Sequence, residues 1–221
     1  FYAISVLTYD QFHEDSERIY FMYRDRATED GAVPVYDTWF PMTEVAVDEF
    51  PVVESGTRIV PAGITWVRAG EKSFEHAITY ADSALFKIFS FPLIEGDRNT
   101  LLNDPNSVVI SEEVAKKFFG EEEALGKTLN FGLVNDRTVT GVIGKLPGNS
   151  TFTFEVIFPI NTAIARQFVG DDLWQGSFCN SFIKLRNEKD IDNLRSQANA
   201  IMEKYVEGSE RGNVLFLPLK D

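Results

Sequence analysis

Cysteine is nearly absent from this chain of 221 residues, which contains one, Cys179. A single thiol excludes an internal disulfide framework and a zinc site built from several thiolates. Reducing compartments and disulfide-free extracytoplasmic proteins both use cysteine this sparingly, so the count leaves the compartment open. We interpret Cys179 as a small buried or half-buried residue, because its neighbours Phe178 and Asn180 offer no basic group that would activate a nucleophile.

Positive charge and long apolar runs are also scarce. The chain has 21 Lys and Arg against 34 Asp and Glu, which gives a net charge of −13. An acidic surface repels nucleic acid phosphates and anionic lipid headgroups, so we expect no nucleic acid partner. No run of about 18 apolar residues occurs, so we expect no transmembrane helix within these residues. The chain starts at Phe1 without a methionine, and we expect it to be a piece of a longer protein.

The residue types that carry chemistry do not form recognisable sites. Of the two histidines, His13 follows Phe12 and precedes two acidic residues, but it lacks a second histidine at the spacing of a metal site. We predict a turn-capping or surface role for His13 and a solvent-side position on a strand for His76. No Gly-x-Ser-x-Gly elbow occurs. The sequence therefore predicts no catalytic residue, no metal site and no cofactor, and we expect that the chain is not an enzyme.

Two short motifs resemble functional signatures but are explained more simply by turns. Asn149-Ser150-Thr151 fits a glycosylation acceptor, but the preceding turn residues explain this composition without a glycan. Gly126-Lys127-Thr128 resembles the end of a phosphate-binding loop, which needs a further glycine where this chain has Glu121. Because a strand-like run follows Lys127 instead of a helix, we interpret the motif as a turn that enters a strand.

Hydrophobic patterning predicts an α+β fold with two lobes. The first and last thirds each favour a β-α-β unit: strands at 19–23 and 59–67 around a helix at 41–53, and strands at 181–185 and 214–217 around a helix at 190–205. The middle favours strands at 73–80, 107–110, 128–133, 137–143 and 151–158, with short helices at 81–89 and 112–119. We expect residues 1–68 plus 177–221 to form one discontinuous lobe, and residues 69–176 to form an inserted, mostly β lobe.

The segment 106–129 is the most informative part of the sequence. Ser111 is a good N-cap, acidic residues occupy the first helical turn where they favour the helix dipole, and Gly120 provides a C-terminal stop. The sequence of the segment, NSVVISEEVAKKFFGEEEALGKTL, resembles a stretch of the extracytoplasmic domain of MacB/FtsX-type ABC transporter permeases, especially those of Bacteroidetes type. Three further phrases resemble the same family in the same order: residues 7–20, residues 139–154, and residues 215–221.

This resemblance implies a fold and a role. Such domains have a porter-like lobe of β-α-β units and a smaller β-rich lobe called Sabre, which agrees with the two lobes expected above. The resemblance implies a periplasmic domain of an inner-membrane permease, in which a separate cytoplasmic ATPase drives movement that exports a substrate. The implied partners are that ATPase, a second permease copy or paralogue, and a periplasmic adaptor protein. An alternative role is that of FtsX, whose outer domain activates a cell-wall hydrolase.

Overall fold

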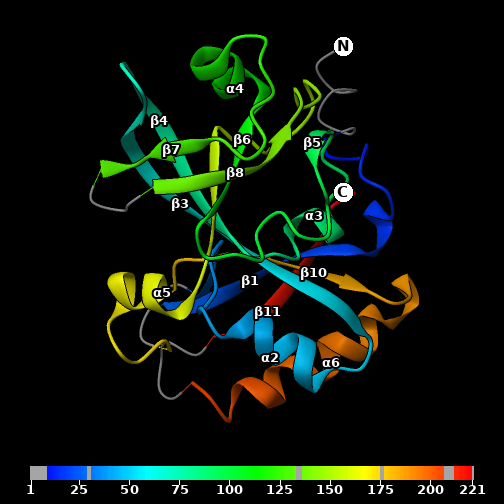
Figure 1. Ribbon diagram of the computed structural model, residues 1–221. Helices are drawn as coiled ribbons and strands as arrows, with labels where there is room; N and C mark the ends of the chain where they lie inside the picture. Colours follow the sequence, from blue (N-terminus) through cyan, green and yellow to red (C-terminus); the bar gives the residue numbers. More distant parts are fainter. Residues whose placement is uncertain (1–8, 29–30, 133–135, 175–176, 207–211, 221) are drawn as a thin grey trace. The chain divides into compact units, whose positions relative to one another are not determined.

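The computed structural model describes residues 9–28, 31–132, 136–174, 177–206 and 212–220 (Figure 1). Its contacts divide the chain into unit 1, Phe1–Arg58 with Asn161–Asp221, and unit 2, Ile59–Ile160. The sequence had placed the divisions at 68/69 and 176/177. The difference arises because strand β3 (Val53–Ala69) passes without interruption from unit 1 into unit 2, so no loop marks the first boundary.

Both β-α-β units that the sequence predicts form, but the strand expected at 59–67 starts already at Val53, so that only its first part belongs to unit 1. The strand order of unit 1 is β11-β1-β10-β3, with β2 paired to β1, and β1 is antiparallel to both β10 and β11. This order is that of a ferredoxin-like β-α-β-β-α-β fold. The elements are η1 (Ser16–Arg18), β1 (Ile19–Thr28), β2 (Gly31–Val35), α2 (Met42–Glu49), the start of β3, α5 (Thr162–Val169), β10 (Asn180–Leu185), η3 (Glu188–Asp190), α6 (Ile191–Met202) and β11 (Val214–Pro218).

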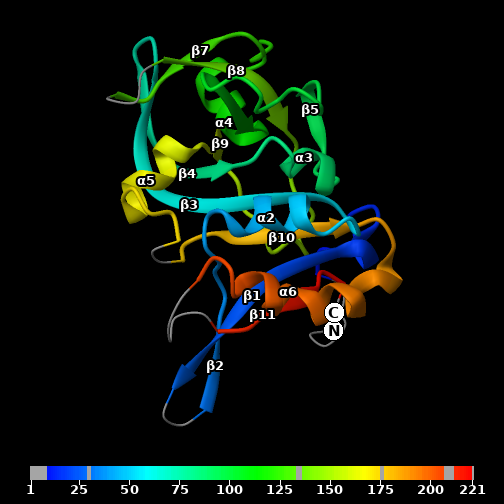
Figure 2. The same cartoon turned by 90° about the horizontal axis from the view of Figure 1, so that it is seen from below.

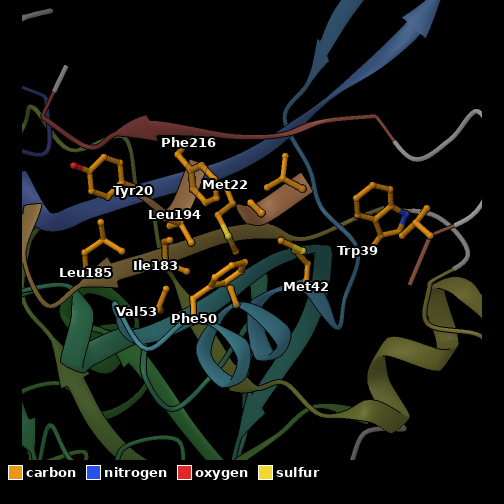
Figure 3. Packing of buried hydrophobic residues seen from close by; sticks show 14 residues of the cluster. Tyr20, Met22, Trp39, Met42, Phe50, Val53, Ile183, Leu185, Leu194 and Phe216 are labelled. Carbon is orange, nitrogen blue, oxygen red and sulfur yellow. The ribbon is translucent and has the colours of Figure 1, made fainter. Parts of the chain in front are cut away.

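The core of unit 1 lies between the sheet and helices α2 and α6 (Figure 3). Alternate residues of β1, Tyr20 and Met22, face this core, as the period of a strand covered on one face requires. Met42 and Phe50 come from α2 and its end, and Leu194 comes from α6. Each such side chain contributes roughly 1.5–3 kcal/mol by leaving water. The sequence missed β2, which forms an exposed hairpin with β1 (Figure 2), and α5.

Unit 2 is a ring of paired strands. The pairings run β3-β4-β9-β6-β8, and β7 pairs with both β8 and β3, which completes the circuit. The pairs β4/β9 and β6/β8 are parallel, and the others are antiparallel. The elements after β3 are β4 (Lys72–Ala81), α3 (Leu85–Ile88), β5 (Leu93–Gly96), β6 (Ser107–Ser111), α4 (Glu112–Phe119), β7 (Thr128–Asn130), β8 (Asp136–Ile143) and β9 (Val156–Pro159).

Three predicted elements of unit 2 are shorter than expected, and β5 was missed; the first is the strand expected at 128–133, which ends at Asn130. The helix expected at 81–89 is only Leu85–Ile88, because β4 continues to Ala81. The strand expected at 151–158 begins at Val156. In the last two cases phenylalanines leave the regular element to pack together: Phe89 and Phe91 contact Phe152, with ring centroids 4.9 and 5.3 Å apart. Helix α4 forms at its predicted position, and Ser111 Oγ accepts a hydrogen bond from Val114 N–H.

Candidate functional site

Both histidines are buried, which corrects the solvent-side position predicted for His76 and the surface alternative predicted for His13. His13 is 3% exposed and contacts the ring of Phe12. Burial lowers the pKa of His13 from 6.5 to about 4, although the nearby Asp10 carboxylate acts in the opposite direction. The side chain is therefore neutral at physiological pH. It lies in a turn between Asp10 and Asp15, which both adopt the left-handed backbone conformation that aspartate tolerates better than most residues.

His76 is 4% exposed and faces the interior of unit 2. It shares a face of β4 with Phe74, and both rings contact Phe118 of α4. The strand was therefore predicted correctly, but the sequence assigned His76 to its solvent-facing side, whereas His76 lies on the buried side. His76 Nδ1 lies 2.8 Å from Glu155 Oε2, which also accepts a hydrogen bond from the Ala77 amide.

The other sequence candidates occupy structural positions. Cys179 is buried, as expected, and its backbone pairs with that of Thr38. Gly126 has a φ of +77° and Thr128 begins β7, which confirms a turn entering a strand. Lys127 pairs with Glu122 at 2.5 Å and lies over the ring of Phe119. Within the described ranges, no group of three or more His, Cys, Asp or Glu could hold a metal ion.

Unit 2 has a groove of about 720 Å³ between α4 and residues 143–155. Its apolar lining includes Leu146, Pro147 and Phe152, and its charged lining includes Glu112 and Glu155. The Lys116 ammonium lowers the pKa of Glu112. Burial opposes ionisation of Glu155, but hydrogen bonds from the Ala77 amide and His76 outweigh it and leave its pKa below the ordinary value. Both carboxylates are therefore anions at neutral pH, and this arrangement suits a charged rim better than acid catalysis.

A second polar site joins three segments of unit 1 through Arg18. Arg18 Nη1 donates to Glu54 Oε2 at 2.9 Å and to the carbonyl oxygens of Leu185 and Arg186 at 3.0 and 3.3 Å. Arg18 Nη2 lies 2.5 Å from Asp15 Oδ2, and Lys184 Nζ lies 2.8 Å from the same oxygen. We call Asp15, Arg18, Glu54 and Lys184 the Arg18 cluster.

Local structure positions this cluster. Asp15 precedes η1, and Arg18 is the last residue of η1, directly before β1. Hydrogen bonds from Lys184 and then from Arg18 lower the pKa of Asp15, and the bond to Asp15 raises the pKa of Arg18. Both groups therefore remain charged across the physiological range. The rigid guanidinium fork fixes the turn before β1 to the end of β10 and the start of β3.

The Arg18 cluster lies where the first and last described parts of the chain meet. Gln11 Nε2 donates to the Lys220 carbonyl at 3.3 Å, and Leu219 N–H donates to the Ile19 carbonyl at 2.9 Å. The sequence indicated none of this except the opposite charges three residues apart at Asp15 and Arg18. Glu54 and Lys184 are far from them in sequence, so no local pattern could have identified the complete cluster.

Comparison with known proteins agrees with this architecture. The family described as the MacB-like periplasmic core domain matches residues 3–201, so the chain belongs to that family and is a periplasmic domain of the kind found in ABC-type transporter permeases. No curated protein matches the chain. Within the described residues, no helix is both long enough and apolar enough to span a membrane.

The solved structures that share the fold include three such domains. A domain of a putative permease from Porphyromonas gingivalis has a TM-score of 0.76 at 20% identity, over 93% of this chain and 92% of that one. The periplasmic region of MacB from Actinobacillus actinomycetemcomitans has a TM-score of 0.63 at 14% identity, over 91% and 89%. The extracellular domain of the noncanonic ABC-type transporter YknZ from Gram-positive bacteria has a TM-score of 0.62 at 14% identity, over 89% and 99%. At these identities the comparison defines the fold.

Proposed function

We propose that this chain is the periplasmic domain of an inner-membrane ABC permease, and that it converts cytoplasmic ATP hydrolysis into movement that exports a substrate. The observation that carries this proposal is the contact between Gln11 and Lys220 beside the Arg18 cluster. The first and last described segments of unit 1 lie side by side, which suits a domain held by two neighbouring membrane helices. The partners are the cytoplasmic ATPase, a second permease copy or paralogue, and a periplasmic adaptor.

The Arg18 cluster gives such a domain a stiff base. Displacement of the turn at 10–18 pulls on β10 through Leu185 and Arg186, and on β3 through Glu54. Several directed hydrogen bonds on one planar group resist a change of angle better than apolar contacts do. In this proposal unit 1 is the porter-like lobe and unit 2 the Sabre-like lobe, and β3 belongs to both.

The test measures movement in the complete permease with its ATPase, reconstituted in lipid nanodiscs. Spin labels are placed at Glu71→Cys, an exposed residue between β3 and β4, in both copies of a homodimeric assembly. Buried Cys179 should remain unlabelled. We expect trapping of ATP with vanadate to shift the distance distribution in the wild type. Arg18→Met, which keeps an unbranched apolar stem but removes the guanidinium with its charge and donors, should lose most of this shift while ATP still binds.

Arg166→Met is the matched control, because Arg166 is an exposed arginine of unit 1 whose nearest carboxylate, Asp171, lies 3.8 Å away. This variant should move as the wild type does. An unchanged nucleotide response in Arg18→Met would contradict the role of the cluster, and a wild type that does not move would contradict the proposed function. If movement controlled a cell-wall hydrolase and left export unaffected, the FtsX-like role would replace transport.

A further inference from the structure

One strand of unit 2 has an edge that the described residues leave uncovered. β4 pairs with one side of β3 from Ile59 to Ala69. On the other side, within unit 2, β7 meets β3 only at the pair Arg68–Asn130. Every second residue of an antiparallel strand directs its N–H and C=O away from the paired neighbour, so residues 64–67 present backbone groups that no strand of the described chain takes up. We call residues 64–67 the β3 edge.

The side chains of the β3 edge are also unusually exposed. Ile64 is 71% exposed and Trp66 is 53% exposed, and they lie two residues apart on the same face. Their partners on β4 are Ala77 and Glu75, both exposed, so neither covers them. Aromatic and aliphatic side chains beside an open edge are typical of a site that accepts another strand.

Residues 61–63, directly before the β3 edge, have features that prevent another strand from pairing with them. The β3 edge itself lacks these features. Pro61 lacks an amide donor, the register shifts between Pro61 and Ile64, and Gly63 has a φ of +82°. Proline and bulges of this kind prevent strands from adding to an edge. They stop at residue 63, so the protected and the open part of the strand are adjacent. An added strand would therefore pair with residues 64–67 and would stop at the bulge.

Charge decides between two possible occupants. Each copy of the chain carries −13, so two copies repel one another. Beside the apolar pair, the exposed Glu75 lies directly opposite Trp66 on β4. We infer that the β3 edge binds an extended segment of a different protein, one that alternates apolar residues with lysine or arginine.

The test uses the full 221-residue chain and two synthetic peptides, four repeats of Lys-Val and four repeats of Glu-Val. We expect the Lys-Val peptide to slow amide hydrogen exchange at residues 64–67 at least fivefold and to quench or shift the fluorescence of Trp66. The Glu-Val peptide should do neither. Trp66→Lys should abolish protection by the Lys-Val peptide while the amides of β4 and β9 keep their exchange rates, which shows that unit 2 remains folded.

Three results would overturn the inference. Equal protection by both peptides would exclude recognition by charge, and an absence of protection at residues 64–67 would exclude strand addition. Protection that appears without peptide and grows with protein concentration would assign the edge to a second copy of the chain. None of these results bears on the Arg18 cluster, so the two proposals can fail separately.

Discussion

The interiors of the two units contain different kinds of contact: buried hydrogen bonds in unit 1 and aromatic packing in unit 2. In unit 1, Ser181 is buried between two threonine hydroxyls, with its Oγ 2.6 Å from Thr38 Oγ and 2.9 Å from Thr43 Oγ. The buried Arg58 guanidinium donates to the Phe40 carbonyl and to Glu44. In unit 2, four phenylalanines pack against Phe91, either edge to face or stacked: Phe86, Phe89, Phe152 and Phe154.

This difference indicates how each unit responds to damage. A hydrogen-bonded interior depends on direction, so one missing partner leaves a buried group unsatisfied. An aromatic interior depends on volume, so one missing ring leaves a cavity. In the proposed function, the polar interior would also help unit 1 to hold its angle at the Arg18 cluster.

The largest effect we expect comes from Phe91→Ala in unit 2. Phe91 is fully buried, and loss of its ring should cost about 3–5 kcal/mol of unfolding free energy. Hydrogen exchange should accelerate across residues 59–160 much more than in unit 1. Phe168→Ala, which truncates a ring that is 45% exposed, should change stability by less than about 0.5 kcal/mol. Equal acceleration in both units would contradict separate cores.

Ser181→Ala in unit 1 should cost about 1–3 kcal/mol, because it removes the shared partner of Thr38 and Thr43. This loss of stability could come from unsatisfied hydroxyl groups or from the small cavity left by the missing oxygen, and a triple variant separates the two causes. Adding Thr38→Val and Thr43→Val should recover most of the loss, since no hydroxyl then remains unsatisfied. Urea denaturation of the wild type, Ser181→Ala and the triple variant measures this, and a triple variant less stable than Ser181→Ala would contradict a polar origin.

The same contrast explains what could be predicted from the sequence. The elements of the two β-α-β units depend on local periodicity, such as Tyr20 and Met22 on β1, and they overlap the predicted ranges, although the strand expected at 59–67 starts at Val53. The ring of unit 2 depends on parallel pairs such as Ile78 with Val156, which are remote in sequence and leave no local pattern. Alternation likewise cannot tell which face of β4 is covered, so the sequence placed His76 in solvent, whereas Phe118 covers it.

The Arg18 cluster was beyond sequence reasoning for a related reason. Arg18 and Asp15 are neighbours on one turn, but Glu54 and Lys184 reach them only through the folded sheet. Charged residues in an acidic chain are by default solvated, so their pattern does not distinguish a cluster from a surface.

His13 should make unit 1 sensitive to mild acid. Its pKa is about 4 in the folded chain and 6.5 ordinarily, so between these values the unfolded chain binds more protons. Stability should therefore fall as pH drops from about 6.5 towards 4, with a slope of at most about 1.4 kcal/mol per pH unit. Urea denaturation from pH 7 to 4.5 measures the slope, and His13→Asn should flatten it.

The carboxylate of Asp15 provides the control for this pH window. Its pKa is lowered by Lys184 and Arg18, so its stabilising contribution is lost only as the pH falls below the ordinary aspartate range. Asp15→Asn should therefore leave the slope between pH 6.5 and 4.5 unchanged. An identical slope in His13→Asn and the wild type would show that another group causes the sensitivity.

The smallest effects should come from a matched pair of helix caps, one in each unit. Ser111 Oγ accepts from Val114 N–H at 3.3 Å, and Asn161 Oδ1 accepts from Ile164 N–H at 3.0 Å. Removal of either cap by alanine should cost its helix about 1 kcal/mol.

The two losses should nevertheless differ in extent, because α4 buries Val114 and Phe118 in the core of unit 2 whereas α5 has an exposed Phe168. Ser111→Ala should lower the unfolding free energy of unit 2 by the full amount, and Ser111→Asp should restore it. Asn161→Ala should accelerate exchange mainly within α5 and change the global unfolding free energy by less than about 0.5 kcal/mol, because a helix that contributes little to the core can fray without unfolding it. Equal global losses for the two caps would mean that α5 is as much a part of the core of unit 1 as α4 is of the core of unit 2.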